Sequence, residues 1–563
     1  MKSLMRFFIS LVLLFTTQVA KSQHALLTLN EEYYHLVDRY AILSADSLNQ
    51  CTSIKPFKRT NLVPLFLPTN RKTILNASPI SRADGYNFDI LEADNWDIIH
   101  TPNKHTFNSR KNIWNRFYHF KGSHFSVNEP DFKLIVNPAL AFAASNDGWR
   151  NTRGLELRGN VGEKLGFYSF ISENQIQFPD YLNDEIESLG VVRGTGFIKT
   201  FGDNGYDFFN AQGYITFKAA DFIDVQFGHD KNFIGNGYRS LILSDIGKEN
   251  LFLKFHTQVW RINYVNLFSE LTDFEQGRTP KQRKKYSAFH YLNVNVIPGK
   301  LDVGVFENIV FARNDSNQQQ GYEIGYLNPI IFYRAAEHSL NSTDNSIIGI
   351  DAKWNFAKGF SFYSQFLLDE FHKDELVNRT GSWVNKWAFQ AGLKYLNVAN
   401  INNLDLQIET NLVRPYVYTH LKTDQSWSHF GQPMAHPMGA NFKEVLAIAR
   451  YQPIPRLNIV AKYFNITHGA DSTLVGNTTH FGGNILADYT NRPKEDGIKI
   501  GDGITQVTNL IDLTISYQLY MRTFLDVRMV MRDSKIKSTQ QNAGTNLFIV
   551  GLRMNLAGQR FDY

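Results

Sequence analysis

The sequence predicts an all-β protein: a transmembrane antiparallel β-barrel of about 18 strands with a small, partly helical N-terminal periplasmic region. Three observations predict this fold. The chain opens with an export signal. From about residue 132 onward, segments of roughly ten residues alternate apolar and polar side chains. Short connections then alternate with long ones between these segments, as the periplasmic turns and surface loops of an outer-membrane barrel do.

The composition agrees with a strand-rich fold. The 563 residues include 44 Phe, 26 Tyr and 8 Trp against 17 Pro, and aromatic rings favour the pleated surface of a sheet. A formal net charge of +5 gives no basic excess for nucleic-acid binding. The mean hydropathy of −0.30 is too polar for a bundle of membrane helices. Cys51 is the single cysteine, which excludes intramolecular disulfides and cysteine-built zinc sites.

The first residues are typical of a secretory signal peptide. Lys2 and Arg6 precede an apolar run over 7–15, and the small residues Ala20 and Ser22 lie at cleavage spacing. The apolar run is about half of the ~20 residues that a membrane helix needs, so removal is favoured over a retained anchor. The predicted organisation is a signal peptide over 1–22, an N-terminal periplasmic region over 23–125 and an outer-membrane barrel over 126–563.

The N-terminal region lacks sustained alternation. Asn30-Glu31-Glu32 is suited to start a short helix that runs through Tyr34 and Leu36 toward Tyr40. An even number of strands returns both chain ends to the same side of the membrane, which is consistent with a periplasmic location for this region.

Hairpins justify the strands of the barrel. The alternating pairs are 154–161 with 165–171, 214–219 with 222–227, 292–296 with 301–305, 348–356 with 360–368, 387–395 with 404–412, 445–451 with 457–463, and 511–519 with 525–531. The long connections between them are 174–210, 229–248, 269–286, 312–346, 413–442 and 467–508. A last strand covers 548–556, and the terminal aromatic Tyr563 suits an outer-membrane assembly signal.

Tyrosines near segment ends fit the aromatic girdles of a membrane barrel. Examples are Tyr168, Tyr395, Tyr463 and Tyr520. The alternative fold is a secreted solenoid or paired sandwiches, in which each apolar face packs on protein. Against it, the apolar face continues strand after strand with no second sheet to cover it.

Three stretches carry a family resemblance: 153–175, 228–244 and 414–441, with a further segment over 328–351. They resemble the capsule-assembly Wzi family of outer-membrane barrels, and most closely its Bacteroidetes gliding-motility branch typified by RemB. The resemblance implies an 18-stranded barrel and a surface role in holding capsular polysaccharide. For the gliding branch it implies a cell-surface part in motility. Phe233 and Ile234 depart from the tryptophan-rich version of the second stretch.

The connection 414–441 supplies most of the candidate polysaccharide-binding residues. Aromatic faces stack on sugar rings, while amides and imidazoles hydrogen-bond hydroxyl groups. The candidates are Tyr416, Tyr418, His420, Trp427, His429, Gln432, His436 and Asn441, together with Arg239 and Glu337 from the other stretches. The alternative interpretation, which we favour, is that the loop folds into the barrel lumen and these side chains hydrogen-bond one another.

The sequence predicts no metal, no cofactor and no catalysis. His420, His429 and His436, with Asp424 between the first two, match no compact metal spacing. No Gly-x-Ser-x-Gly elbow is present. The basic residues within 278–285 are either a solvated loop or a contact for lipopolysaccharide phosphates.

The functional prediction is a non-enzymatic outer-membrane surface protein of gliding motility that binds or handles cell-surface polysaccharide in adhesion or capsule attachment. The predicted partners are surface polysaccharide or capsule, outer-membrane lipid and lipopolysaccharide, and proteins of the gliding or secretion machinery. Nucleic acid is not among them. The alternative is a porin or export channel, because eighteen strands leave room for an aqueous lumen.

Overall fold

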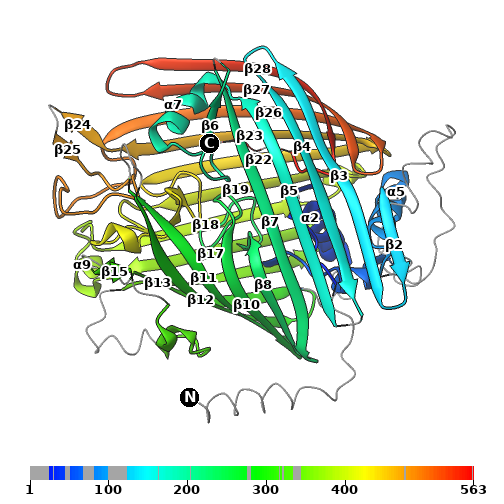
Figure 1. Cartoon of the computed structure of the whole chain (residues 1–563). Helices are drawn as coiled ribbons and strands as arrows, with labels where there is room; N and C mark the ends of the chain where they lie inside the picture. Colours follow the sequence, from blue (N-terminus) through cyan, green and yellow to red (C-terminus); the bar gives the residue numbers. More distant parts are fainter. Residues whose placement is uncertain are drawn as a thin grey trace, which may run out of the picture.

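The computed structural model is a closed barrel of 18 antiparallel strands, as predicted (Figure 1). The last strand, β28 (Asn542–Met554), pairs with the first wall strand, β3 (Phe132–Ser145), with Met554 opposite Leu140. Because this pairing joins the two ends of the sheet, the wall has no unpaired edge. That closure satisfies the backbone hydrogen bonds of strands that cross a lipid bilayer.

The structure describes residues 24–29, 31–44, 51–66, 81–98, 123–162, 164–202, 204–275, 281–312, 314–315, 318–319, 322–333, 344–474, 477–558, 560 and 562. The predicted signal peptide lies outside these residues. Within the described ranges, none of the helices has the length and apolar character needed to cross a membrane.

The other wall strands follow one another around the barrel. They are β4 (Gly148–Val161), β5 (Leu165–Gln177), β7 (Gly205–Ala220), β8 (Ile223–Asp230), β10 (Asn250–Val259), β11 (Ile262–Glu275), β12 (Lys281–Ile297), β13 (Leu301–Phe311), β16 (Asn345–Ala357), β17 (Phe360–Glu370), β18 (Lys386–Tyr395), β19 (Leu404–Val413), β22 (Phe442–Ile454), β23 (Leu457–Ala470), β26 (Ile504–Tyr520) and β27 (Thr523–Ile536).

Short strands and helices lie inside the barrel or at its rims. The short strands are β1 (Ile54–Lys55) with β9 (Phe233–Ile234), β2 (Phe125–Glu129) beside β3, β6 (Lys199–Phe201) beside β7, β14 (Asn314–Asp315) with β15 (Gln318–Gln319), β20 (Ser428–His429) with β21 (Gln432–Pro433), and β24 (Ser472–Leu474) with β25 (Asn477–Thr479). The helices are α2 (Glu31–Ser44), α3 (Arg59–Phe66), α5 (Arg82–Asp94), α7 (Asp180–Leu189), α9 (Lys373–Val377) and the 3₁₀ turns η1 (Ile324–Leu327), η3 (Val398–Asn400) and η4 (Thr423–Gln425).

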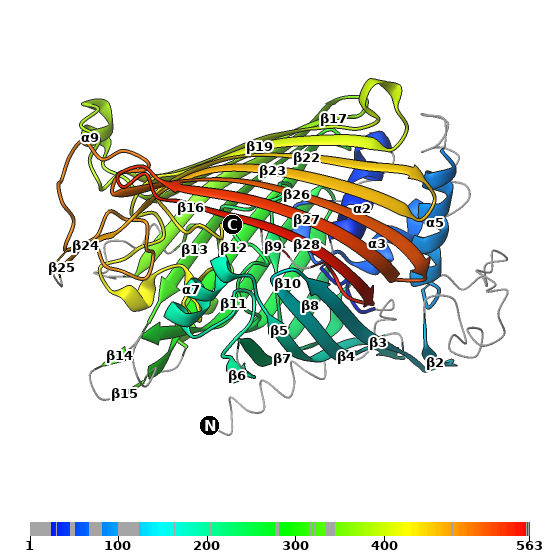
Figure 2. The same cartoon turned by 90° about the horizontal axis from the view of Figure 1, so that it is seen from above.

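The barrel has a turn end and a loop end. Tight turns, such as those between β4 and β5 or between β16 and β17, gather at the turn end together with α2, α3 and α5 (Figure 2). The long connections, with α9 and the β24–β25 pair, gather at the loop end. All of the predicted hairpins are present as paired strands.

One predicted connection is wrong. The range 269–286 is mostly strand, because β11 runs to Glu275 and β12 starts at Lys281. Its many polar residues conceal a strand, and one of them, Lys285, has its partners in the lumen. Lys285 is buried and donates to the Ser426 carbonyl at 2.8 Å and to Ser428 Oγ at 2.9 Å.

The outer face of the wall is apolar and the inner face is polar. On β28, Phe548, Val550 and Leu552 are 56%, 42% and 38% exposed. Arg553, which follows them in the sequence, points inward and is 6% exposed. This alternation is that of strands between lipid and a polar interior, so the protein is an integral barrel of the outer membrane.

The tyrosine girdle prediction fails at one position. Tyr463 is exposed on the outer face, but Tyr168 is 4% exposed and stacks on Tyr214 with 5.2 Å between ring centroids. Tyr168 belongs to the inward-facing set of β5, since a single residue decides on which face of a strand a side chain lies.

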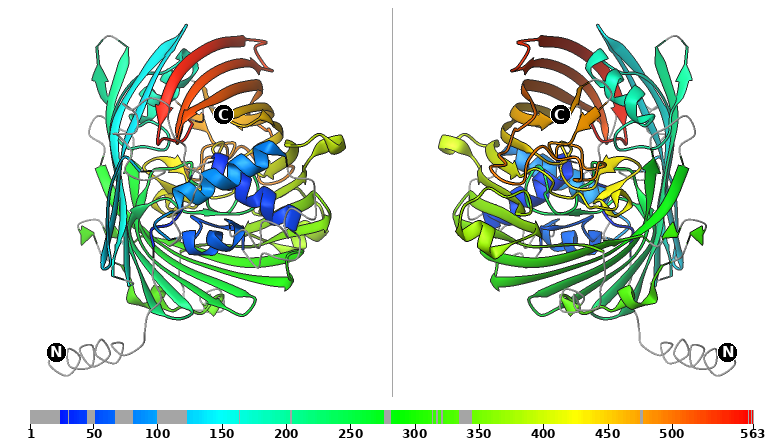
Figure 3. Two further views of the ribbon diagram at one scale, coloured as in Figure 1. Left: turned by 90° about the vertical axis from the view of Figure 1, so that its right-hand side faces the viewer. Right: turned by 90° about the vertical axis from the view of Figure 1, so that its left-hand side faces the viewer.

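The N-terminal part is partly helical, as predicted, and its helices pack inside the turn end of the barrel (Figure 3). On α2, Asp38 accepts from the wall residues Lys353 and Lys394, at 2.5 Å from each Nζ. On α5, Asn87 donates to Gln452 Oε1 at 2.7 Å. These contacts join the helices to the wall, so the N-terminal part is not a free-standing unit.

A segment over 322–333, here called the strap, lies against the outer wall. Tyr264 of β11 donates a hydrogen bond to the Pro329 carbonyl, and Phe332 N–H donates to Glu307 Oε2 of β13 at 2.7 Å. Glu307 pairs in register with His290, whose Nδ1 is 2.6 Å from Asn266 Oδ1. All three members of this polar row are buried.

The C-terminal tail leaves the wall and enters the lumen (Figure 1). The last strand ends at Met554 rather than at 556, and Arg560 forms an ion pair with Asp245 of the β8–β10 connection. Tyr563 lies outside the described residues. The last strand therefore ends two residues earlier than predicted, and buried charges hold the tail inside the barrel.

Candidate functional site in the lumen and on the loop face

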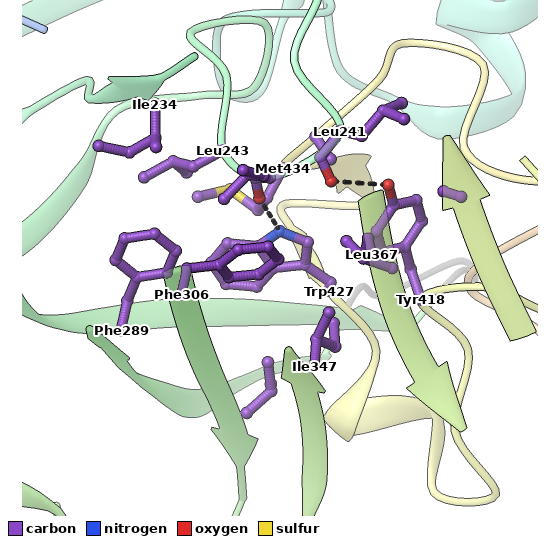
Figure 4. Close-up of a cluster of buried hydrophobic side chains, with 14 of the residues drawn as sticks. Ile234, Leu241, Leu243, Phe289, Phe306, Ile347, Leu367, Tyr418, Trp427 and Met434 are labelled. Atoms are coloured by element: carbon purple, nitrogen blue, oxygen red, sulfur yellow. Dashed lines mark hydrogen bonds between the residues drawn. The ribbon is translucent and has the colours of Figure 1, made fainter. Parts of the chain in front are cut away.

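The 414–441 connection folds into the loop end of the barrel and packs on the 234–243 stretch (Figure 4). Trp427 is 3% exposed and donates from Nε1 to the Ile242 carbonyl at 3.0 Å. Tyr418 is 1% exposed and donates from its hydroxyl to the Leu241 carbonyl at 2.8 Å. Both rings therefore contribute to an apolar core inside the barrel rather than to a surface.

The other aromatic and amide candidates are also bonded within the protein. Tyr416 donates to the His480 carbonyl at 2.7 Å. Gln432 accepts from Gly194 N–H at 2.7 Å and donates to the Thr195 carbonyl at 2.9 Å. Asn441 donates to the carbonyls of Gly469, Phe481 and Asp502 and accepts from Gly501 N–H. Each of these side chains joins the connection to a neighbouring loop.

His429 is held as a neutral imidazole. Its Nδ1 accepts from Thr272 N–H at 2.9 Å, and its Nε2 lies 3.1 Å from the Glu249 carbonyl. A neutral ring with its proton on Nε2 satisfies both bonds. Burial lowers the pKa of His429 to about 3.

A charged centre joins the loop, the wall and the C-terminal tail. Arg239 lies 3.2 Å from Glu444 Oε1 of β22 and 3.2 Å from Asp562 Oδ1, while His436 Nε2 lies 2.9 Å from Glu444 Oε2. Tyr238 also donates to Asp562. Burial disfavours the charge of Asp562, but the neighbouring charge of Arg239 outweighs it and holds the pKa of that carboxyl well below its usual range.

The structure therefore buries most of the predicted site residues in the lumen, as the favoured interpretation had it, but the side-chain hydrogen bonds given above join them to other segments rather than to one another. His420 is the exception, because it remains partly exposed at the loop end. Glu337 lies outside the described residues. The three histidines do not converge: within the described part of the chain, no group of three His, Cys, Asp or Glu side chains is arranged to hold a metal ion.

Sequence reasoning missed an aromatic cluster on the loop face. Trp383 from the β17–β18 connection and Tyr489 from the β23–β26 connection lie with ring centroids 4.5 Å apart. The Arg492 guanidinium lies 4.3 Å from the Trp383 centroid, and Trp383 Nε1 donates to Glu495 Oε2 at 2.7 Å. We call these four residues the loop-face cluster. Trp383 lies about a hundred positions before the other three in the sequence, so no local pattern joins it to them.

The loop-face cluster is accessible. Trp383, Tyr489 and Arg492 are half-buried, Glu495 is exposed, and Leu421 beside them is 53% exposed. Its chemistry is an aromatic surface flanked by the anionic Glu495 and the cationic Arg492, with the buried Lys386 Nζ 4.5 Å from the Tyr489 ring centroid. Such a surface presents both a stacking face and hydrogen-bonding groups to a bound molecule.

Comparison with known proteins agrees with this architecture. The family model described as "Capsule assembly protein Wzi" matches residues 154–547. Among solved structures, this chain is similar to Wzi of Escherichia coli, which is described as a carbohydrate-binding β-barrel involved in group 1 capsule assembly. The two superpose with a TM-score of 0.56 at 13% sequence identity, and the match covers 95% of this chain and 100% of that one. At this identity the likeness shows the fold alone.

Two further solved structures match more weakly. OccAB2 of Acinetobacter baumannii gives a TM-score of 0.40 at 10% identity, over 75% of this chain and 97% of that one. OprD of Pseudomonas aeruginosa gives 0.39 at 8% identity, over 75% and 94%. No curated protein matches the sequence. Because the family model covers most of the chain, this barrel belongs to the Wzi family of non-enzymatic capsule assembly proteins.

Proposed function

We propose that this protein binds cell-surface polysaccharide at the loop face of its barrel and holds it there, in adhesion or capsule attachment, without catalysis. The observation that carries the proposal is the loop-face cluster of Trp383, Tyr489, Arg492 and Glu495. Loop ends of outer-membrane barrels face the cell exterior, where such polymers lie.

The cluster has the groups that sugars require. Aromatic faces cover the C–H surfaces of a sugar ring, and the charged side chains at their edge bond its hydroxyls or a carboxylate. Membership of a capsule-assembly family supports the same ligand class. The residues of the 414–441 connection then act as the buried support that fixes the neighbouring loops.

The filled lumen favours holding a polymer over passing a solute. The helices occupy the turn end and the 414–441 connection occupies the loop end. A passive channel needs a continuous aqueous path, so this arrangement supports a surface-binding role over the porin alternative.

A role in gliding motility is the finer part of the proposal. In this role the loop face binds surface glycan while the turn end and N-terminal helices contact envelope proteins of the gliding or secretion machinery. Weak binding by many copies gives firm attachment through avidity. A deletion strain is expected to lose spreading on surfaces, and normal spreading with lost capsule retention would restrict the protein to capsule attachment.

The binding test uses purified barrel and polysaccharide from the producing organism. Replacing both rings, Trp383→Ala with Tyr489→Ala, is expected to weaken binding at least tenfold, which is a loss of about 1.4 kcal/mol. Trp260→Ala is the matched control, since Trp260 is 72% exposed at the turn end. If all variants bind the polysaccharide equally, the binding site lies outside the loop-face cluster. If the parent protein does not bind it, polysaccharide recognition is contradicted.

A further inference from the structure

The lumen contains a second candidate site, centred on Arg150. Two adjoining cavities, of about 240 and 300 Å³, lie between the wall, the N-terminal segment and the C-terminal tail. They share Tyr33, Arg150, Ala557, Gly558 and Arg560 in their linings. Ala557 and Gly558 are exposed, so these cavities are open to solvent rather than sealed.

Most arginines that line these cavities are neutralised by a carboxylate. Arg528 holds Asp512 through two hydrogen bonds, at 2.9 and 2.8 Å. Arg553 donates to Asp526 at 2.5 Å, and Arg522 donates to Glu156 at 2.9 Å. Arg560 pairs with Asp245, and Arg39 pairs with Asp405. Each of these five guanidinium groups therefore has an acidic partner.

Arg150 has no such partner within the described residues. Its Nε donates to Thr152 Oγ1 at 2.8 Å, and within the described residues it has no other hydrogen bond and no ion pair. Its two terminal nitrogens form the fork that binds a carboxylate or phosphate through parallel hydrogen bonds. Arg150 is half-buried and lines both cavities, and a guanidinium whose fork has no carboxylate bonded to it is suited to bind an anionic ligand from the solvent.

The surroundings of Arg150 favour a sugar over a bare ion. Thr514, Ser516 and Gln518 of β26 line one cavity with hydroxyl and amide groups. Asn210 lines the other, and its Oδ1 is buried with no hydrogen-bond partner in the described structure. Tyr33 lines both. The cavity of about 240 Å³ is large enough to hold one sugar ring.

We propose that the Arg150 cavity binds a carboxylate-bearing saccharide unit, with its carboxylate on the Arg150 guanidinium and its hydroxyls on the neighbouring amide and hydroxyl side chains. This site goes beyond the proposed function, because it lies in the lumen and does not depend on the loop-face cluster. An acidic sugar residue, as a free unit or as the end of a chain, is the ligand class.

The test measures binding to the full-length barrel in detergent by titration calorimetry, with D-glucuronate, inorganic phosphate and D-glucose as probes. Glucuronate is expected to bind, glucose is not, and Arg150→Gln is expected to weaken glucuronate binding at least tenfold. Arg153→Gln is the matched control, because Arg153 lies on the same strand, is exposed and faces the opposite side of the wall. Heat-dependent gel mobility verifies that every variant is folded.

The proposal is overturned if the parent protein does not bind glucuronate, or if Arg150→Gln binds glucuronate as tightly as the parent does. It is also overturned if phosphate binds as tightly as glucuronate, because the cavity would then be a simple anion site. The paired Trp383→Ala and Tyr489→Ala variant separates the two sites. Its glucuronate affinity is expected to stay within twofold of the parent value while its polysaccharide binding falls.

Discussion

Single buried side chains determine how the 414–441 connection sits in the lumen. Tyr418 and Trp427 donate to the carbonyls of Leu241 and Ile242, while His429 and Asn441 bond the Glu249 and Gly469 carbonyls of two other segments. Hydrogen bonds made out of contact with water are costly to lose, because the partner left behind has no replacement. The residues chosen from the sequence as ligands for sugar are thus the residues that fix the loop.

Acidification is expected to loosen this loop through His429. Its pKa is lowered to about 3 by burial, against about 6.5 for an exposed histidine. Between these pH values His429 binds a proton in the unfolded chain but not in the folded protein. The free energy of unfolding therefore falls as the pH drops from about 6.5 to 3.

The measurement is urea unfolding at pH 7 and pH 5. His429→Gln, which retains one acceptor and a donor, is expected to lose part of the pH dependence, up to about 1.4 kcal/mol for each pH unit in this window. The same pH dependence in variant and parent would show that His429 is not held neutral.

Trp427→Ala is expected to destabilise the protein by about 3–5 kcal/mol, because it empties a fully packed site and leaves the Ile242 carbonyl without its donor. Denaturant unfolding measures this change. Trp260→Ala, at a highly exposed position, is expected to stay within about 0.5 kcal/mol of the parent. Similar effects of both changes would contradict the burial of Trp427.

Among the elements, the strap over 322–333 has the clearest structural task. It covers Asn266, His290 and Glu307, a polar row on the face of the wall that otherwise contacts lipid. Its outward side carries apolar residues instead, with Ile324 at 80% and Ile330 at 60% exposure. The strap therefore covers a polar part of the outer wall and presents an apolar surface to the lipid in its place.

Replacing the strap by a short Gly-Ser linker is expected to lower stability by about 1–3 kcal/mol for each polar group that it exposes to lipid. Thermal unfolding in lipid vesicles measures the loss. Replacing the exposed α9 turn by the same linker is the control, and an equal loss in both variants would mean that the strap shields nothing.

For the whole molecule, the filling of both ends predicts a closed barrel. In planar bilayers the parent protein is expected to pass little current. Removing residues 415–440, which fill the loop end, is expected to produce a conductance of the kind seen in eighteen-stranded porins. A large current through the parent protein would favour the channel alternative over surface binding.

The sequence by itself determined the barrel. Alternation along segments such as 511–519 and the tight turn at Pro298-Gly299-Lys300 predicted strands and pairings that the structure contains, because both signals are local. The same local signals placed Tyr168 on the wrong face and ended β11 too early. In both places the partners that stabilise the side chains come from distant segments.

The site depended on tertiary structure for the same reason. Tyr416 and Trp427 have the residue types of a sugar site, and only the fold decides that they are buried. The loop-face cluster unites residues near 383 with residues near 490, and the Arg150 cavity depends on which guanidinium lacks a carboxylate. Local sequence encodes strand period and turns, whereas burial and charge pairing depend on which distant segments the closed barrel brings together.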